Sequence, residues 1–259
     1  MLTKKDLKES LINLGLRRGM VVYVQSSLKP LGYVVGGAQT IIDALMEVIG
    51  FEGTLVMPAF TKGLCDPSAL KPNTIPRDCF QEFRVNALPF QKKLTIPHNM
   101  GEVVSQFMRN EGVLRSNHPI YSFFAWGKYA KLIVEKHPLH FGLSKDSPLG
   151  KVVELNGYVL LMGMSYDKCT VFHQAQYNAK RCPLILHTYP IEKGHRMEWI
   201  KMLDLDLNAI GYKAIGEQME NRRVVKQCTI GKASCRLFSA KEALSSASLY
   251  LNGKNNEII

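Results

Sequence analysis

The first sixty residues show two kinds of hydrophobic pattern in alternation. In residues 3–15 and 38–49, leucine and isoleucine recur every three or four positions, which predicts two amphipathic helices. Residues 20–25 and 54–59 are apolar on both faces, as in strands buried within a sheet. A strand, a helix and a second strand in this order form a βαβ unit, which predicts an α/β sheet with a right-handed crossover.

The same two patterns continue through the rest of the chain. Further strands are expected at 123–126, 158–163, 224–230 and 234–238, and further helices at 100–110, 127–136, from Ser147, at 169–180, at 205–219 and after Ser239. Residues 61–99 hold five prolines and no sustained periodicity, which predicts a long loop in a position to cover a site. We therefore predict a single α/β domain over residues 1–259. It has a central mixed, largely parallel sheet flanked by helices, a long proline-containing loop and a smaller α+β portion at about 183–259.

The composition indicates a soluble chain with reduced thiols. Apolar runs such as Val21–Val24 are far shorter than the roughly 20 residues of a membrane helix, and no cationic, apolar leader opens the sequence. The six cysteines lack CxxC spacing, which argues against a disulfide framework and a zinc cluster. His137 and His140 have no partner cluster. We expect a cytoplasmic protein without membrane contact and without a metal site.

Positive charge is the strongest compositional signal. There are 33 Lys and Arg residues against 22 Asp and Glu, a net charge of +11 with neutral histidines. Such a surface either attracts an anionic partner or is simply solvated. The basic residues are scattered and no nucleic-acid motif is present, so we expect no nucleic acid and favour phosphate-bearing small molecules.

Small polar residues follow the first predicted strand, where α/β sheets place ligands. Ser26, Ser27 and Leu28 offer backbone N–H groups at the strand end, and Gly36 and Gly37 let an anion approach the start of the next helix. The spacing is not that of a G-x-G-x-x-G loop. A plain turn is therefore the competing interpretation.

Two other polar segments precede predicted elements. Arg115, Ser116 and His118 lie in the first, and Ser147 begins the second. A serine followed by proline is an ordinary helix start. A ligand role for these residues thus competes with a structural one.

A third polar segment holds a candidate acid–base pair. After the strand at 158–163, a loop carries Asp167 and a helix presents His173, so Asp167 could orient His173 as a general base. Glu192 or Glu198 could take the place of Asp167. Cys169 lies one helical turn before His173, which leaves a Cys–His nucleophile pair and a purely structural histidine as alternatives.

Six segments of the chain together resemble the aminoglycoside 3-N-acetyltransferase family. They follow the family's order over nearly the whole chain: S-S-L-K-P-L-G-Y-V-V-G-G-A-Q-T (26–40), F-E-G-T-L-V-M-P-A-F-T (51–61), R-S-N-H-P-I-Y-S-F-F-A-W-G (115–127), H-P-L-H-F-G-L-S-K-D-S-P-L-G-K (137–151), Y-V-L-L-M-G (158–163) and G-K-A-S-C-R-L-F-S (231–239).

The resemblance implies a single acyltransferase domain that moves an acyl group from a CoA thioester to an amine of an antibiotic or related sugar. The family's H-x-A-E-Y segment is H-Q-A-Q-Y here, so His173 inherits the position of the catalytic histidine. Acetyl-CoA or another acyl-CoA is the implied co-substrate. The residues expected at CoA are Ser26, Ser27, Leu28, Val34, Val35, Gly36, Arg115, Ser116 and Ser147.

The implied chemistry is direct transfer without a covalent acyl-enzyme. A neutral His173 takes the proton of the attacking amine, and backbone N–H groups near Ser26–Leu28 or Ser147 bind the oxyanion. Asp167 would orient the histidine.

Two departures from the family pattern bear on the acceptor. Relatives usually have histidine and glutamate where this chain has Gln25 and Gln176. Because an aminoglycoside is a polycation, the loss of an acid in a chain of charge +11 favours an amino sugar that carries phosphates, such as a nucleotide-linked one. An aminoglycoside antibiotic as acceptor, or a catalytically silent CoA- or sugar-binding relative, is the alternative. The protein could also be an oligomer.

Overall fold

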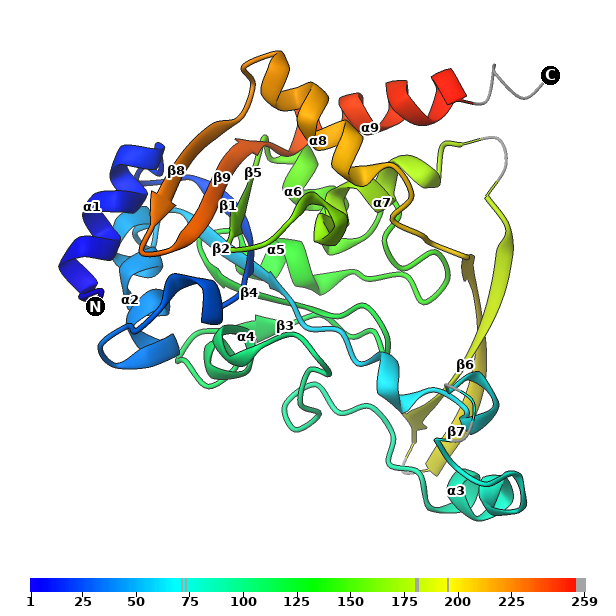
Figure 1. Ribbon diagram of the computed structural model, residues 1–259. Helices are drawn as coiled ribbons and strands as arrows, with labels where there is room; N and C mark the ends of the chain where they lie inside the picture. The colour runs from blue at the N-terminus through cyan, green and yellow to red at the C-terminus, as the bar shows by residue number, and fades with distance from the viewer. Residues whose placement is uncertain (71, 73, 180–181, 195, 255–259) are drawn as a thin grey trace.

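A seven-stranded mixed sheet forms the centre of the molecule (Figure 1). The computed structural model describes residues 1–70, 72, 74–179, 182–194 and 196–254. The strands lie in the order β3 (Leu114–Arg115), β4 (Phe123–Gly127), β2 (Thr54–Pro58), β1 (Val21–Ser26), β5 (Tyr158–Met162), β9 (Ala233–Ser239) and β8 (Lys226–Ile230). The three central strands, β2, β1 and β5, are parallel, and the outer strands pair antiparallel. The predicted mixed α/β sheet is confirmed, with its parallel part at the centre.

Helices cover both faces of this sheet. All six residues of β1 are buried, and alternate side chains enter opposite cores. Val22 and Val24 pack with α1 (Lys4–Leu14), α2 (Gly37–Ile49) and α4 (Glu102–Phe107). On the other face Val21 and Tyr23 belong to a core with residues of α5 (Ala130–Glu135), α6 (Pro148–Glu154), α7 (Thr170–Gln176), α8 (Tyr212–Asn221) and α9 (Ala240–Lys254). The continuous apolar runs of the central strands follow from this two-sided burial.

The N-terminal elements agree closely with the sequence prediction. The helix at 3–15 is α1, which begins with a capping box between Thr3 and Asp6. The unit β1–α2–β2 is the predicted βαβ unit, with β1 and β2 parallel. The helix predicted at 169–180 is α7; Lys180 lies outside the described residues.

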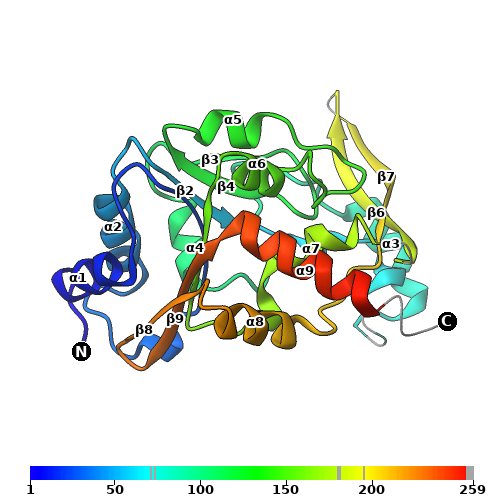
Figure 2. The same ribbon diagram turned by 90° about the horizontal axis from the view of Figure 1, so that it is seen from above.

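A long hairpin was not predicted. Strands β6 (Leu184–Lys193) and β7 (Arg196–Leu205) form a separate two-stranded sheet, at the opposite side of the molecule from α1 and α2 (Figures 1 and 2). The predicted helix at 205–219 is wrong at its start, because Leu205 ends β7 and the helix α8 begins at Tyr212. Strands β8 and β9 join the main sheet, so the C-terminal portion is built into the core.

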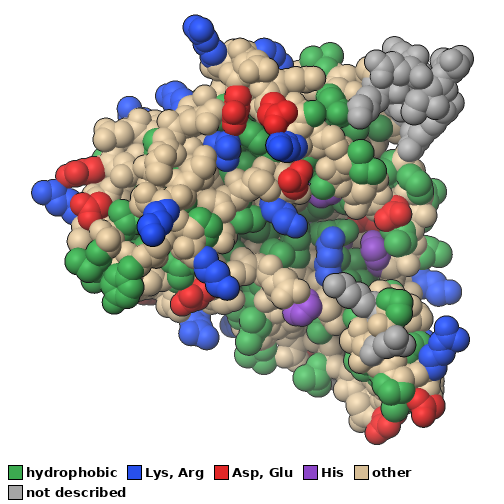
Figure 3. Space-filling view, viewed as in Figure 1, with side chains coloured by type: hydrophobic (Ala, Val, Ile, Leu, Met, Phe, Trp, Pro, Cys, Tyr) green, Lys and Arg blue, Asp and Glu red, His purple; other side chains and the backbone are tan. Residues whose placement is uncertain are grey.

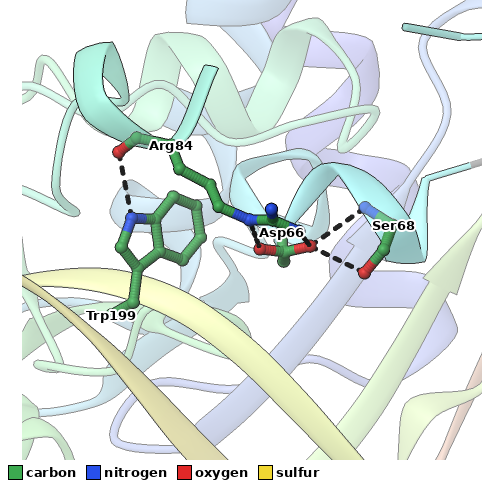
Figure 4. Close-up of polar contacts among 4 residues, drawn as sticks. All are labelled: Asp66, Ser68, Arg84 and Trp199. Carbon is green, nitrogen blue, oxygen red and sulfur yellow. Dashed lines mark hydrogen bonds and ion pairs between the residues drawn. The ribbon is translucent and has the colours of Figure 1, made fainter. Parts of the chain in front are cut away.

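The proline-rich stretch packs against this hairpin. Its described residues are not one plain loop, since they form η2 (Lys62–Leu64), η3 (Pro67–Ala69), η4 (Arg77–Cys79) and α3 (Phe80–Asn86). Asp66 accepts hydrogen bonds from Arg84 and Ser68, and Trp199 of β7 donates to the Arg84 carbonyl at 3.0 Å (Figure 4). These hydrogen bonds connect η3 to α3, and α3 to strand β7 of the hairpin.

No helix within the described ranges combines the length and the apolar character needed to cross a bilayer.

Candidate active site

A cavity of about 480 Å³ lies at the carboxyl ends of the central parallel strands. Gln25 and Ser26 line it from β1, Pro58 from β2, and His173 from α7. Parallel strands bring their carboxyl ends to one edge of a sheet, where open α/β folds bind ligands. Ser26 and His173, predicted as site residues from separate segments, are thus brought together.

The outer walls of the cavity come from segments beside the hairpin. Lys62, His98 and Asn99 belong to the proline-rich stretch, and Leu207 and Ala209 follow β7. The face shown in Figure 3 is hollowed between the sheet and the hairpin, and histidine, basic and acidic side chains gather around the hollow.

His173 carries an uncharged imidazole at this cavity. Its Nδ1 lies 2.7 Å from the hydroxyl of Tyr212 and 3.5 Å from Oε1 of Gln176. Burial lowers the pKa of His173 to about 4, and the positive charge of Lys62 adds to this effect. At neutral pH the ring is therefore able to accept a proton.

The position of Gln176 favours hydrogen on Nδ1 of the His173 ring. Its Nε2 donates to the carbonyl of Asn208 at 2.6 Å, so its Oε1 is the atom that faces His173. An amide oxygen can only accept, whereas the Tyr212 hydroxyl can accept as well as donate. Hydrogen on Nδ1 satisfies both neighbours and leaves Nε2 unprotonated, the state that a general base requires.

The expected partner of His173 is replaced by Tyr212. Asp167 lines the same cavity, but its carboxylate accepts from Ser165 at 3.4 Å rather than from the imidazole. Glu192 and Glu198 are exposed on the hairpin. No carboxylate among the described residues is hydrogen-bonded to the His173 ring.

Cys169 does not have the properties of a nucleophile. It is completely buried, and burial raises the pKa of its thiol to about 12. A thiol in this state is inert, because the thiolate is the reactive form. The Cys–His alternative therefore loses its support.

Gln25 connects the end of β1 to the start of α7. Its Nε2 donates to the Lys168 carbonyl at 2.5 Å, and its Oε1 accepts from the Thr170 N–H at 2.9 Å. The side chain is buried, and both of its polar atoms are used. It therefore holds the helix that carries His173 against the sheet.

Ser26 offers a hydroxyl that is free for a ligand. The residue is only 9% exposed, and its Oγ has no hydrogen-bond partner among the described residues. A buried polar atom without a partner is costly, so a ligand that binds it removes that cost. The neighbouring Ser27 N–H is already used, since it donates to the Met162 carbonyl at 2.9 Å.

Three residues expected at CoA lie outside this cavity. The buried Arg115 guanidinium donates to Ser122 and to three backbone carbonyls, those of Ala59, Lys92 and Thr95. The Ser116 hydroxyl accepts from the Phe123 N–H, and the Ser147 hydroxyl caps α6. The polar atoms of these three residues make hydrogen bonds within the protein. The sequence pattern alone could not distinguish this structural role from ligand binding.

The residues of the glycine-containing loop also stand apart from His173. Val34 is buried, Val35 donates its N–H to the Leu2 carbonyl, and Gly36 caps α2 in a left-handed conformation. Leu28 packs against the same core as Val34. None of the four lines the His173 cavity.

A second cavity adjoins the first. It measures about 510 Å³ and shares Met164 and Asp167 with the His173 cavity. Pro30, from the chain that follows Ser26–Leu28, lines it together with Lys213 and Lys232. An elongated ligand could therefore extend from His173 toward the loop at residues 27–36.

Two site residues were missed by the sequence reasoning. Tyr212 lies 39 positions after His173, and no local pattern connects them. Lys62 lies in the proline-rich stretch, which was predicted as a loop that could cover a site but from which no site residue was named.

Comparisons with known proteins agree over nearly the whole chain. The model of the family described as Aminoglycoside 3-N-acetyltransferase matches residues 23–252. The SPbeta prophage-derived aminoglycoside N(3')-acetyltransferase-like protein YokD of Bacillus subtilis (strain 168) is 38% identical over 246 residues, which are 95% of this chain and 90% of that protein.

Solved structures give the same result. The crystal structure of YokD superposes with a TM-score of 0.95 at 36% identity, covering 99% of this chain and 96% of that one. The structure of AAC-IIIb in binary complex with CoASH superposes with a TM-score of 0.87 at 25% identity, covering 98% and 97%. The chain therefore belongs to the aminoglycoside 3-N-acetyltransferase family, whose members are N-acyltransferases with acetyl-CoA as co-substrate.

Proposed function

We propose that this chain transfers an acyl group from a CoA thioester to the primary amine of an amino sugar, with His173 as general base. The observation that carries the proposal is the uncharged His173 imidazole, which borders the cavity at the ends of β1 and β2 beside the unpartnered Ser26 hydroxyl. The family membership supports the same reaction class.

The proposed reaction is direct transfer. The amine nitrogen attacks the thioester carbonyl carbon while Nε2 of His173 takes the proton from that nitrogen. Tyr212 Oη and Gln176 Oε1 both lie at Nδ1, where they accept from the imidazolium N–H and stabilise its charge. The C–S bond then breaks, and the proton passes from His173 to the departing thiolate. The inert Cys169 supports a route without an acyl-enzyme.

Ser26 is the donor that we assign to the oxyanion. Its hydroxyl is unpartnered and lines the cavity, whereas the Ser27 N–H is occupied. One oxyanion donor is worth ~2.7–4 kcal/mol in the transition state. The pantetheine arm would lie beside Ser26 and the nucleotide toward Pro30 and the second cavity.

The charges at the cavity favour an acceptor that carries anionic groups. Of the described residues that line it, Lys62 and Lys168 are cationic and Asp167 is the one carboxylate. A polycationic antibiotic would gain little electrostatic attraction in this cavity, whereas the phosphates of a nucleotide-linked amino sugar would complement the lysine charges. Acetylation of an aminoglycoside is the second candidate, and the names of the relatives favour it. A catalytically silent binding protein is the third, and the two neutral residues Gln25 and Gln176 are its support.

Release of free thiol from acetyl-CoA tests the proposal. We expect release with a nucleotide-linked amino sugar and less with a 2-deoxystreptamine antibiotic. In His173→Ala, turnover should fall by about 10²–10⁴-fold while CoA binding persists. Preference for the antibiotic would establish the second candidate. An absence of thiol release with every amine, in protein that still binds CoA, would establish the third.

A further inference from the structure

Among the described residues, no carboxylate is hydrogen-bonded to the His173 ring, and Asp167 lines the same cavity without contacting it. The two groups at Nδ1 of His173 are the neutral side chains of Tyr212 and Gln176. When His173 takes a proton it becomes a cation, so a nearby anion would favour the transfer. The charged and titratable groups around the ring and around Lys62 are Asp167, Lys168, His98, Tyr212, Tyr121, His187 and Asp204.

Lys62 is a cation without an ion-pair partner in this cavity. Its Nζ lies 5.3 Å from the centre of the Tyr121 ring, and no carboxylate of the described residues lies within 4.0 Å of it. Lys62 is exposed as a residue, although partial burial of its ammonium lowers the pKa, an effect that Asp204 opposes. Asp204 itself is occupied, because it accepts from Tyr177, Gly142 N–H and Leu205 N–H.

Lys62 and His173 line the same cavity, so the charge of Lys62 influences the imidazole. It is one of the causes that lower the pKa of His173, and it lowers that of His187 as well. In the absence of ligand, Lys62 thus opposes the proton transfer that the reaction needs. An anion bound to its ammonium would cancel this opposition.

We propose that Lys62 binds an anionic group of the amine acceptor, so that the substrate itself supplies a negative charge that no described residue places in contact with the His173 ring. The acceptor class is an amino sugar with a phosphate near its amine. This inference rests on the proposed acyl transfer for its catalytic meaning, but the anion site can be tested without turnover.

The first experiment follows the His173 ring by NMR in pH titrations without ligand and with saturating glucosamine 1-phosphate. We expect the midpoint of His173 protonation to rise by about one pH unit. Glucosamine without phosphate should not produce this rise. Glucosamine 1-phosphate should not produce it in the Lys62→Met variant. Lys201→Met, which removes an exposed lysine of the hairpin, is the matched control and should behave like the parent protein.

Three outcomes would overturn the inference. One is a His173 titration that glucosamine 1-phosphate leaves unchanged, and another is an equal rise in Lys62→Met. The third is a Lys62-dependent rise produced by desulfo-CoA, because Lys62 would then bind the phosphates of the donor. Inorganic phosphate as a further probe shows whether the sugar contributes to binding.

The second experiment compares kcat/KM for acetylation of amines with and without a phosphate. We expect the preference for the phosphorylated amine to fall by at least about tenfold in Lys62→Met, since one charge-assisted contact is lost. If the parent protein and Lys62→Met show the same preference for the phosphorylated amine, the inference is wrong and the proposed function stands. If no amine is acetylated but the NMR shift occurs, the anion site stands and the proposed function is wrong.

Discussion

The hydroxyl of Tyr212, at the start of α8, lies 2.7 Å from Nδ1 of His173 on α7. The Tyr212 ring is completely buried, and it packs against the Phe172 ring in a T-shaped arrangement. Packing therefore fixes the hydroxyl in place. A tyrosine occupies the position where a carboxylate was expected to orient the base.

Replacement of this tyrosine should reduce catalysis more than binding. In Tyr212→Phe the ring remains packed, but the imidazole loses its closest polar contact. A hydrogen bond of about 0.5–1.5 kcal/mol corresponds to a loss of up to about tenfold in kcat, with KM for acetyl-CoA unchanged. Steady-state thiol release measures both constants. An unaltered kcat in a variant with normal thermal stability would remove Tyr212 from the positioning of His173.

A carboxylate at position 176 should increase the basicity of the imidazole. Gln176→Glu places a negative charge next to Nδ1 of His173 and removes the hydrogen bond to the Asn208 carbonyl. Since the pKa of His173 is about 4, the parent enzyme should keep its base unprotonated down to about that pH. The acid limb of the kcat profile should move upward by about one unit or more in the variant.

Gln176→Leu is the partner variant for this measurement. It also removes the bond to Asn208 but adds no charge. Its acid limb should stay near that of the parent protein, and an equal upward shift in both variants would show that charge is not the cause.

Loss of the Gln25 side chain should loosen the start of α7. Gln25→Ala removes partners from the Lys168 carbonyl and the Thr170 N–H, at a cost of about 1–3 kcal/mol in the free energy of unfolding. Urea denaturation measures this cost. Gln25→Glu retains the acceptor but not the donor, so it should restore only part of the stability. Full stability in the alanine variant would contradict the role that we assign.

Acid should destabilise the fold through two neighbouring histidines. The rings of His118 and His137 lie 4.4 Å apart, and burial is the main cause that lowers the pKa of each, to about 4 for His137. Nδ1 of His118 accepts two backbone N–H bonds, from Ile120 and Tyr121, so this ring must stay neutral in the folded state.

The direction of the pH effect follows from these pKa values. A histidine whose folded pKa lies below its unfolded value of about 6.5 contributes stability above that pH, and the contribution is lost as the pH falls toward the folded pKa. The urea midpoint should therefore fall between about pH 6.5 and pH 4. His137→Gln should show a smaller dependence on pH over that interval, and an unchanged slope would contradict this account.

The sequence was informative where local patterns determine structure. The six buried residues of β1 and the capping box of α1 are continuous signals, and both elements were predicted within a residue or two. The hairpin has no such signal, because Leu184 and Leu186 of β6 are exposed and its strands pair only with each other. Exposed leucines at alternate positions do not follow the usual rule of a polar outer face.

The residues of the candidate site likewise fall into those that local sequence patterns predicted and those that only the structure reveals. Ser26 and His173 were predicted because they follow strands or begin helices at the sheet edge. Arg115 was assigned to CoA from the resemblance, and only the structure reveals that its guanidinium is used up by backbone carbonyls. Tyr212 and Lys62 were missed, since their relation to His173 depends on long-range packing.

Hydrogen bonds connect the hairpin to the proline-rich stretch, and this connection bears on how the acceptor specificity of the enzyme can evolve. The Tyr189 hydroxyl of β6 donates to the Lys62 carbonyl at 2.9 Å, and Asp66 N–H donates to the Thr188 carbonyl. Lys62 and the hairpin thus belong to one unit outside the main sheet, while His173 and Ser26 belong to the sheet and its helices. If the amine binds against this unit, as we propose, substitutions there can admit a new acceptor without altering the positions of His173 and Ser26.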